Sequence, residues 1–200
     1  MNLINTPAPD FTAAAVLPDG SIENAFRLQD VIRDRYAVLF FYPLDFTFVC
    51  PTELLAFHHR VADFGQRDTA VIGVSIDSQY THLAWRVTPT DQGGVGQLAY
   101  PLVADPSHRI VRAYGVQAAS GDVALRATFI IDREGLIRHQ SINDLPLGRN
   151  VDEYLRLIDA LQFHEQHGEV CPAGWQPGRP AMKADREGVA DYLRSNARHL

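Results

Sequence analysis

The sequence predicts an α/β fold in which helices flank a central β-sheet. Residues 36–42 and 69–77 are apolar runs without polar alternation, a pattern typical of strands that are buried on both faces of a sheet. Between these runs, apolar residues recur at helical spacing over residues 49–64. Because a strand, a helix and a strand follow one another, we expect the two strands to pair in parallel through a right-handed crossover.

The other elements are expected on either side of this unit. Before it, residues 12–16 lead into a turn signal at residues 17–21, which favours a hairpin, and residues 28–32 favour a short helix. After it, the pattern predicts helices at residues 81–86, 106–114 and 151–163, a short strand at 100–105, and an antiparallel hairpin formed by residues 125–132 and 136–142.

The composition changes after His167 and Gly168. Residues 171–180 are rich in proline and glycine, which indicates an arm rather than a core element, and residues 185–194 favour a short amphipathic helix. We therefore expect a domain at residues 1–165 and a C-terminal arm at residues 166–200.

Composition and charge exclude several classes of function. The 200 residues are 46% hydrophobic, which is enough for a packed core. The net charge of −6 comes without a basic run, so nucleic-acid binding has little electrostatic support. No apolar stretch reaches the roughly 18 residues that a membrane span needs, and the N-terminus lacks the pattern of a signal peptide. We expect a cytoplasmic protein that does not bind membranes.

The chemistry is predicted to centre on residues 41–53, where a strand ends at Pro43 and a helix begins near Cys50. The N–H groups of a helix's first turn have no partners within the helix, and the helix dipole places partial positive charge there. Both effects favour a thiolate. Pro51 fits this position, because the first turn does not need its missing N–H.

The helix terminus is too weak to activate Cys50 alone. A free cysteine has a pKa of about 8.5, and lowering it by one unit requires about 1.4 kcal/mol. A helix terminus supplies roughly 0.3–1 kcal/mol. We therefore expect a hydroxyl donor, for which Thr47 is well placed, and a cation from elsewhere in the chain.

The chain has two cysteines, Cys50 and Cys171, and no Cys-x-x-Cys motif. This count excludes a small disulfide-rich scaffold and disfavours a general disulfide oxidoreductase of the thioredoxin type. From the count alone, the two could still be unrelated thiols in a reducing compartment.

Three stretches of the chain belong together: Pro43-x-x-x-Thr47-x-x-Cys50, Arg126 in a later strand, and residues 168–175 with the sequence Gly-Glu-Val-Cys-Pro-Ala-Gly-Trp. In combination they resemble the typical two-cysteine peroxiredoxins, the alkyl hydroperoxide reductase and thiol-specific antioxidant family. The resemblance implies a thioredoxin-like fold with a mixed sheet. It also implies reduction of hydrogen peroxide, alkyl hydroperoxides and peroxynitrite by a thiolate, without a metal or flavin cofactor.

The resemblance also implies roles for single residues. Cys50 would be the peroxidatic cysteine, which becomes a sulfenic acid, while Thr47 and Arg126 hydrogen-bond the thiolate and the peroxide oxygens. Pro43 would shield the sulfenic acid, and Glu53 together with Arg149 would orient Arg126. Preorganised donors of this kind stabilise the negative charge that develops on the leaving oxygen.

Cys171 resembles the resolving cysteine, which condenses with the sulfenic acid to form a disulfide. In this family it comes from the partner subunit, which implies a homodimer that often assembles further into a decamer. The helix turn at Cys50 would have to unwind for the two sulfurs to meet. Thioredoxin or a flavin-dependent disulfide reductase would then regenerate the protein.

Two elements depart from the family pattern. Members that are sensitive to overoxidation carry a Gly-Gly-Leu-Gly loop and a C-terminal Tyr-Phe helix, whereas this chain has Gly-Gly-Val-Gly at residues 93–96 and Tyr192-Leu193. Our hypothesis is an intermediate sensitivity, in which the terminal helix prolongs the sulfenic state.

The residues leave two other classes of function open. His164, His167 and Cys171 could offer metal ligands, but the local sequence supplies no clear fourth ligand for zinc. A non-enzymatic oligomeric holdase chaperone, or a peroxide sensor on the same fold, is the alternative to an enzyme. Loss of peroxide consumption in a Cys50→Ser protein would separate the enzyme from the holdase.

Overall fold

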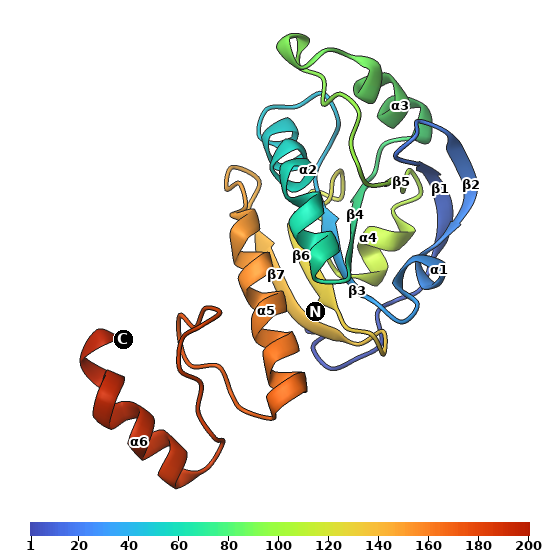
Figure 1. Ribbon diagram of the computed structural model, residues 1–200. Coiled ribbons are helices and arrows are strands. Elements are labelled where there is room, and N and C mark those ends of the chain that lie inside the picture. Colours follow the sequence, from blue (N-terminus) through green and yellow to red (C-terminus); the bar gives the residue numbers. More distant parts are fainter. The chain divides into compact units, whose positions relative to one another are not determined.

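The computed structural model describes residues 1–200 except for the side chain of His199. It contains two compact units, Met1–Val151 and Asp152–Leu200 (Figure 1).

The first unit is built on one mixed sheet of seven strands in the order β2-β1-β5-β4-β3-β6-β7. The strands are β1 (Thr12–Val16), β2 (Ile22–Arg27), β3 (Tyr36–Phe41), β4 (Thr69–Ser75), β5 (Leu102–Ala104), β6 (Arg126–Ile131) and β7 (Ile137–Asn143). Strands β3 and β4 are the two predicted apolar runs, and they pair in parallel from Tyr36 opposite Thr69 to Phe41 opposite Val74. The predicted hairpins β1–β2 and β6–β7 are antiparallel. The α/β class and the mixed sheet are confirmed.

The helices of this unit are α1 (Leu28–Ile32), α2 (Cys50–Gln66), α3 (Gln79–Val87) and α4 (Arg109–Ala113), with a 3₁₀ turn η1 (Thr90–Gln92). The predicted helix at residues 106–114 begins late, at Arg109. The carboxylate of Asp105 accepts the N–H groups of Arg109, Ile110 and Val111, and His108 has a left-handed backbone with φ of 57°. The chain therefore turns before it becomes helical.

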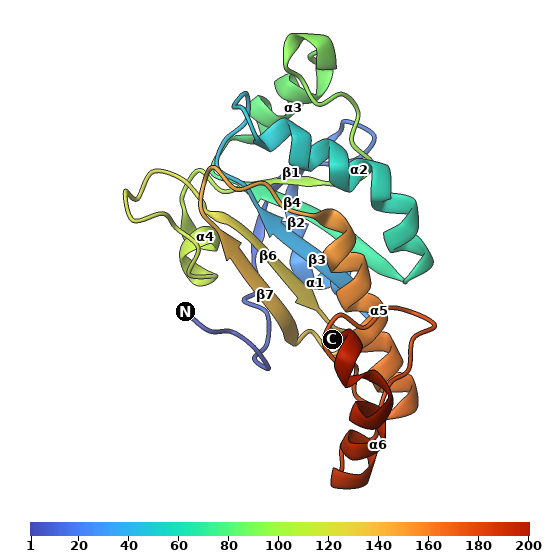
Figure 2. The same cartoon turned by 90° about the vertical axis from the view of Figure 1, so that its left-hand side faces the viewer.

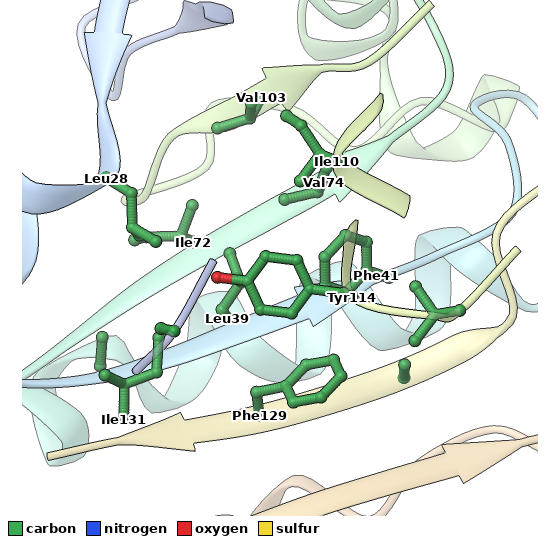
Figure 3. Packing of buried hydrophobic residues seen from close by; sticks show 14 of the residues in the cluster. Leu28, Leu39, Phe41, Ile72, Val74, Val103, Ile110, Tyr114, Phe129 and Ile131 are labelled. Carbon is green, nitrogen blue, oxygen red and sulfur yellow. The ribbon is translucent and has the colours of Figure 1, made fainter. Parts of the chain in front are cut away.

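Strand β3 is buried on both faces, as its apolar run predicted. On one face, the ring of Tyr114 lies 5.2 Å from that of Phe41 and 5.0 Å from that of Phe129, in the core beside α1 and α4 (Figure 3). On the other face, Phe40 stacks on Phe57 of α2 at 4.1 Å between ring centroids. Figure 2 shows α2 running along the sheet. The two packed faces fix the end of β3, from which the chain enters α2.

The second unit contains α5 (Val151–His167), α6 (Arg186–Asn196) and a 3₁₀ turn η2 (Ala197–His199). Helix α5 continues past the predicted end, residue 163, and the rings of Phe163 and His167 stack at 4.2 Å. The arm is held by Trp175, whose ring lies 4.9 Å from that of Phe163 and whose Nε1 donates to Arg179 O. Asp185 caps α6 by accepting the N–H of Gly188.

Among the described residues, no helix has both the length and the apolar character that crossing a membrane requires.

Candidate active site

Cys50 is the first residue of α2, and its side chain is fully buried. Pro51 occupies the first turn, as predicted, and Val49 at the N-cap makes no side-chain capping bond. The backbone geometry therefore places the thiol at the positive end of a 17-residue helix.

The predicted cation is Arg126, the first residue of β6. Its Nη1 lies 3.3 Å from the Cys50 sulfur and 2.7 Å from Oε2 of Glu53, and its Nε donates to Leu145 O at 2.6 Å. The residue is only 4% exposed. The guanidinium is thus fixed by two other acceptors while it faces the sulfur.

Glu53 lies one helical turn after Cys50 and links two arginines. Its Oε1 accepts from Nε and from the backbone N–H of Arg149 at 2.8 and 3.0 Å, and its Oε2 accepts from Nη2 of Arg149 at 2.9 Å as well as from Arg126. Arg149 also donates to the carbonyls of Phe41 and Ala127, at the ends of β3 and β6. Glu53 and Arg149 therefore tie helix, sheet and arginine into one rigid network.

The charges of this network do not cancel. Arg126 and Arg149 carry two positive charges, and the carboxylate of Glu53 offsets one of them. All three side chains are at least 95% buried, so solvent screens their charges little. One net positive charge therefore lies next to the Cys50 sulfur, and a buried charge is stable when it is paired and hydrogen-bonded.

Thr47 has a different partner from the expected one. Its hydroxyl donates to Leu44 O at 2.8 Å, so in this conformation its single proton does not point to the thiolate. The oxygen keeps its lone pairs and can accept the O–H of a peroxide. Pro43 is buried two residues after the end of β3, near the start of the same loop.

Cys171 lies in the second unit. Its thiol is half-buried and donates to Ala160 O at 3.5 Å. Burial raises the pKa of Cys171, while the charge of Arg156 opposes this shift and that of Glu169 adds to it. A raised pKa favours the thiol form of Cys171 over its thiolate.

The weighed metal site receives no support from the geometry. Within the described part of the chain, no group of three or more His, Cys, Asp or Glu side chains is arranged to hold a metal ion. Instead, Nδ1 of His164 and Nδ1 of His167 lie within hydrogen-bond distance of the carbonyls of Glu169 and Phe163.

A second polar cluster, which the sequence pattern did not predict, lies at the loop between β3 and α2. Asp45 accepts from the hydroxyl of Tyr42 at 2.8 Å and lies 2.7 Å from Nδ1 of His82, which is on α3. Burial raises the pKa of Asp45, and the hydrogen bond with His82 opposes the shift. One signal could have found this cluster: parallel pairing of β3 and β4 brings the residues after both strands, including Asp45 and Asp77, to one edge of the sheet.

A cavity of about 740 Å³ opens elsewhere in the first unit, lined by residues that include Phe11, Gln79 and Arg109. None of the predicted site residues lines it. Its buried carboxylate, Asp105, already accepts the backbone N–H groups that start α4, so the cavity gives no sign of a ligand.

A buried cysteine at a helix N-terminus, with an arginine at its sulfur, defines a thiol-based oxidoreductase. The chain matches the AhpC/TSA family over residues 4–140, and the C-terminal domain of 1-Cys peroxiredoxin over residues 160–195. It is 51% identical over 195 residues to alkyl hydroperoxide reductase C of Helicobacter pylori strain ATCC 700392 / 26695, covering 98% of both chains. It is also 51% identical over 190 residues to peroxiredoxin-1 of Gallus gallus, covering 95% of this chain and 94% of that one.

A solved structure agrees with these relatives. The reduced 2-Cys peroxiredoxin of Plasmodium vivax superposes with a TM-score of 0.94 at 44% identity, covering 98% of this chain and 100% of that one. The chain belongs to the AhpC/TSA family, as a typical 2-Cys peroxiredoxin with the thioredoxin-like fold. It is a thiol peroxidase, which reduces hydroperoxides through a peroxidatic cysteine.

Proposed function

We propose that Cys50 is the peroxidatic cysteine. The observation that carries this assignment is the 3.3 Å contact between its buried sulfur and the guanidinium of Arg126. Glu53 and Arg149 add rigidity, and together with Arg126 they carry one net positive charge next to the sulfur. These features favour a thiolate that is already desolvated and oriented when the peroxide arrives.

The reaction begins when the thiolate attacks one oxygen of the peroxide. The S–O bond forms as the O–O bond breaks, so sulfur is oxidised to a sulfenic acid, while the other oxygen leaves as hydroxide or alkoxide and takes up a proton. Arg126 donates to the oxygens as negative charge moves onto them, and the lone pairs of Thr47 hold the O–H of the peroxide. Hydrogen peroxide, alkyl hydroperoxides and peroxynitrous acid, the protonated form of peroxynitrite, all present such an O–O bond; from the last of these the leaving group is nitrite.

The remaining predicted residues support this step. Glu53 and Arg149 fix the direction of the Arg126 guanidinium. The hydrogen bonds that the Glu53 carboxylate accepts from both arginines support this role. Pro43, buried at the start of the loop, shields the sulfenic acid from water. The peroxidase domain comprises residues 1–165.

Cys171, in the arm of residues 166–200, then resolves the sulfenic acid. Its sulfur attacks the Cys50 sulfur, a disulfide forms, and the hydroxyl of the sulfenic acid leaves as water. The bond joins two subunits of a homodimer, which assembles further into a decamer. Because the Cys50 sulfur is fully buried, the first turn of α2 unwinds to expose it.

A dithiol partner, thioredoxin or a flavin-dependent disulfide reductase, regenerates the two thiols by exchange. Neither the reaction with peroxide nor the formation of the disulfide needs a metal or flavin bound to this chain. Two free cysteines fit a reducing compartment, and this supports a cytoplasmic location.

Non-reducing electrophoresis after one equivalent of hydrogen peroxide tests this function. We expect a dimer band from the wild type and monomer bands from Cys50→Ser and Cys171→Ser, with peroxide consumption lost in Cys50→Ser. A wild-type band that stays monomeric would remove the intersubunit disulfide. Peroxide consumption by Cys50→Ser at the wild-type rate would remove Cys50 from the reaction.

A further inference from the structure

The loop between β3 and α2 holds an energetically costly backbone conformation. Phe46 has φ of 52°, in the left-handed region, and its side chain is half exposed. For a residue with a Cβ this conformation costs roughly 1–2 kcal/mol. Such strain persists where contacts with neighbouring residues hold the backbone in place, and it is common at functional sites.

Asp45, the residue before Phe46, supplies the restraint. Its carboxylate lies 2.7 Å from Nδ1 of His82 and accepts from the hydroxyl of Tyr42, and its backbone N–H donates to Oδ2 of Asp77 at 2.9 Å. These partners come from α3 and from the ends of β3 and β4. Asp45 is therefore anchored to three elements of the rigid first unit.

His82 is fully buried, and its hydrogen bonds determine where its protons lie. Its Nε2 lies 3.2 Å from Val103 O, and a carbonyl can only accept, so Nε2 carries a proton. The contact between Nδ1 and Asp45 then shares one further proton. Loss of either side chain would leave a buried polar group without its partner, so the pair locks the loop strongly.

The locked segment is the one that directs Thr47. The Thr47 hydroxyl donates to Leu44 O, so the donor and its acceptor lie on either side of the anchored Asp45. Cys50, in contrast, is held from the other side by Arg126 and by the first turn of α2. A shift of the loop would therefore displace the Thr47 lone pairs while leaving the thiolate and its cation in place.

We propose that Asp45 and His82 are positioning residues for the peroxide step, which hold Thr47 so that its oxygen accepts the O–H of the bound peroxide. This inference rests on the proposed roles of Cys50 and Thr47.

The test compares two reactions of the same sulfur. The rate constant of Cys50 is measured with hydrogen peroxide, which uses Thr47, and with iodoacetamide, which needs the thiolate alone. For Asp45→Ala we expect the peroxide rate to fall about ten- to a hundred-fold, the scale of a small misplacement of a reacting group, while alkylation stays near the wild-type rate. The glutamine of His82→Gln has a similar size but can donate to only one of the two acceptors, Asp45 and Val103 O. This variant should lose less of the peroxide rate than Asp45→Ala, and its alkylation rate should stay near that of the wild type.

The conservative variant Asp45→Asn provides the control. Its carbonyl can still accept from Tyr42, and its amide can donate to Nδ1 of neutral His82, so the peroxide rate should return toward that of the wild type. In a double-mutant cycle, Asp45→Ala should add little to the loss caused by Thr47→Val, because both changes act through one hydroxyl.

Several outcomes would overturn the inference: equal losses of both rates, a wild-type peroxide rate in His82→Gln, or additive losses in the cycle. These outcomes differ from failure of the proposed function, in which Cys50→Ser itself keeps consuming peroxide. If Asp45→Ala does not fold, as circular dichroism would show, the rates of His82→Gln and Asp45→Asn decide the matter.

Discussion

The guanidinium of Arg126 lies 3.3 Å from the sulfur of Cys50, and one of its nitrogens serves both this sulfur and the carboxylate of Glu53. A single nitrogen, Nη1, therefore takes part in both the contact to the thiol and the buried ion pair. Removing it should affect both reactivity and the geometry of the site.

Arg126→Met should lower the rate of Cys50 oxidation by hydrogen peroxide about 10²- to 10³-fold, the usual cost of losing one preorganised donor to a developing negative charge. Alkylation by iodoacetamide at pH 7 should slow as well, because the thiolate loses its cation. Arg126→Lys should recover little, since an ammonium cannot reproduce the planar contacts to sulfur, carboxylate and Leu145 O. Stopped-flow fluorescence measures the first rate, and an unchanged value would contradict the assignment of Arg126.

Glu53→Gln should destabilise the fold. It leaves the buried guanidiniums of Arg126 and Arg149 without a carboxylate, and breaking a buried ion pair on one side costs about 3–5 kcal/mol. The matched control is Asp191→Asn, which breaks the exposed pair with Arg194 and should cost less than about 1 kcal/mol. Urea unfolding gives the free energy of unfolding of both variants. Equal losses would show that the buried network stabilises the fold no more than the exposed pair does.

Arg86→Met should loosen the segment that precedes β5. The buried guanidinium of Arg86 donates to four backbone carbonyls, those of Val16, Pro18, Leu98 and Tyr100. Burial lowers the pKa of Arg86, because the charged guanidinium has lost its water. The four hydrogen bonds to carbonyls offset this loss. Loss of the bonds leaves buried acceptors unpaired, and the free energy of unfolding should fall by about 3 kcal/mol.

The exposed Arg33 is the control for this change. Arg33→Met should alter the free energy of unfolding by less than about 0.5 kcal/mol. Hydrogen exchange should also be faster around Leu98 and Tyr100 in Arg86→Met, because Arg86 binds the carbonyls of these residues. Wild-type exchange there would mean that Arg86 does not restrain the segment.

Stability should depend on pH through His58. Its Nδ1 accepts the N–H of Ala99 at 3.1 Å, which requires the neutral ring. Burial, and then the neighbouring His59, lower the pKa of His58 in the folded state. The folded state therefore binds fewer protons than the unfolded one, and this contribution is fully present above the ordinary histidine pKa of about 6.5 and is lost as the pH falls below it.

Urea unfolding between pH 7.5 and 5 checks this dependence. The His58→Gln variant should lose part of the wild-type slope, whereas His59→Gln should keep most of it, since burial is the larger cause. Identical slopes in the wild type and in His58→Gln would rule out this linkage.

Deletion of residues 188–200, most of α6, tests the hypothesis of intermediate overoxidation. If α6 slows the unwinding at Cys50, its loss should reduce the sulfinic fraction formed during turnover at rising peroxide concentrations. Mass spectrometry of the Cys50 peptide measures this fraction. An unchanged fraction would show that α6 has no such effect.

Much of the fold followed from local patterns. The runs of β3 and β4 are apolar on both faces because helices or side-chain clusters cover both sides, and this leaves a plain signal in the sequence. The start of α2 at Cys50 followed from Pro43 and Pro51. The need for a cation followed from a comparison of energies, although its identity as Arg126 came from the resemblance.

The details that could not be predicted are set by distant parts of the chain. The bond from Arg149 to Glu53 spans 96 residues and depends on how the hairpin of β6 and β7 ends beside α2. The pairing of Asp45 with His82 depends on where α3 begins after β4. The bond from the Thr47 hydroxyl to Leu44 O depends on how the loop after β3 folds back, and no residue pattern encodes it.

The position of β6 in the chain has a consequence for synthesis. Cys50 and Arg126 are 76 residues apart, and they meet only once β6 has been added beside β3. A chain that leaves the ribosome from its N-terminus therefore carries the cysteine well before the guanidinium that contacts its sulfur. On the proposed role of Arg126, the thiol of such a nascent chain reacts slowly with peroxide until β6 has joined the sheet.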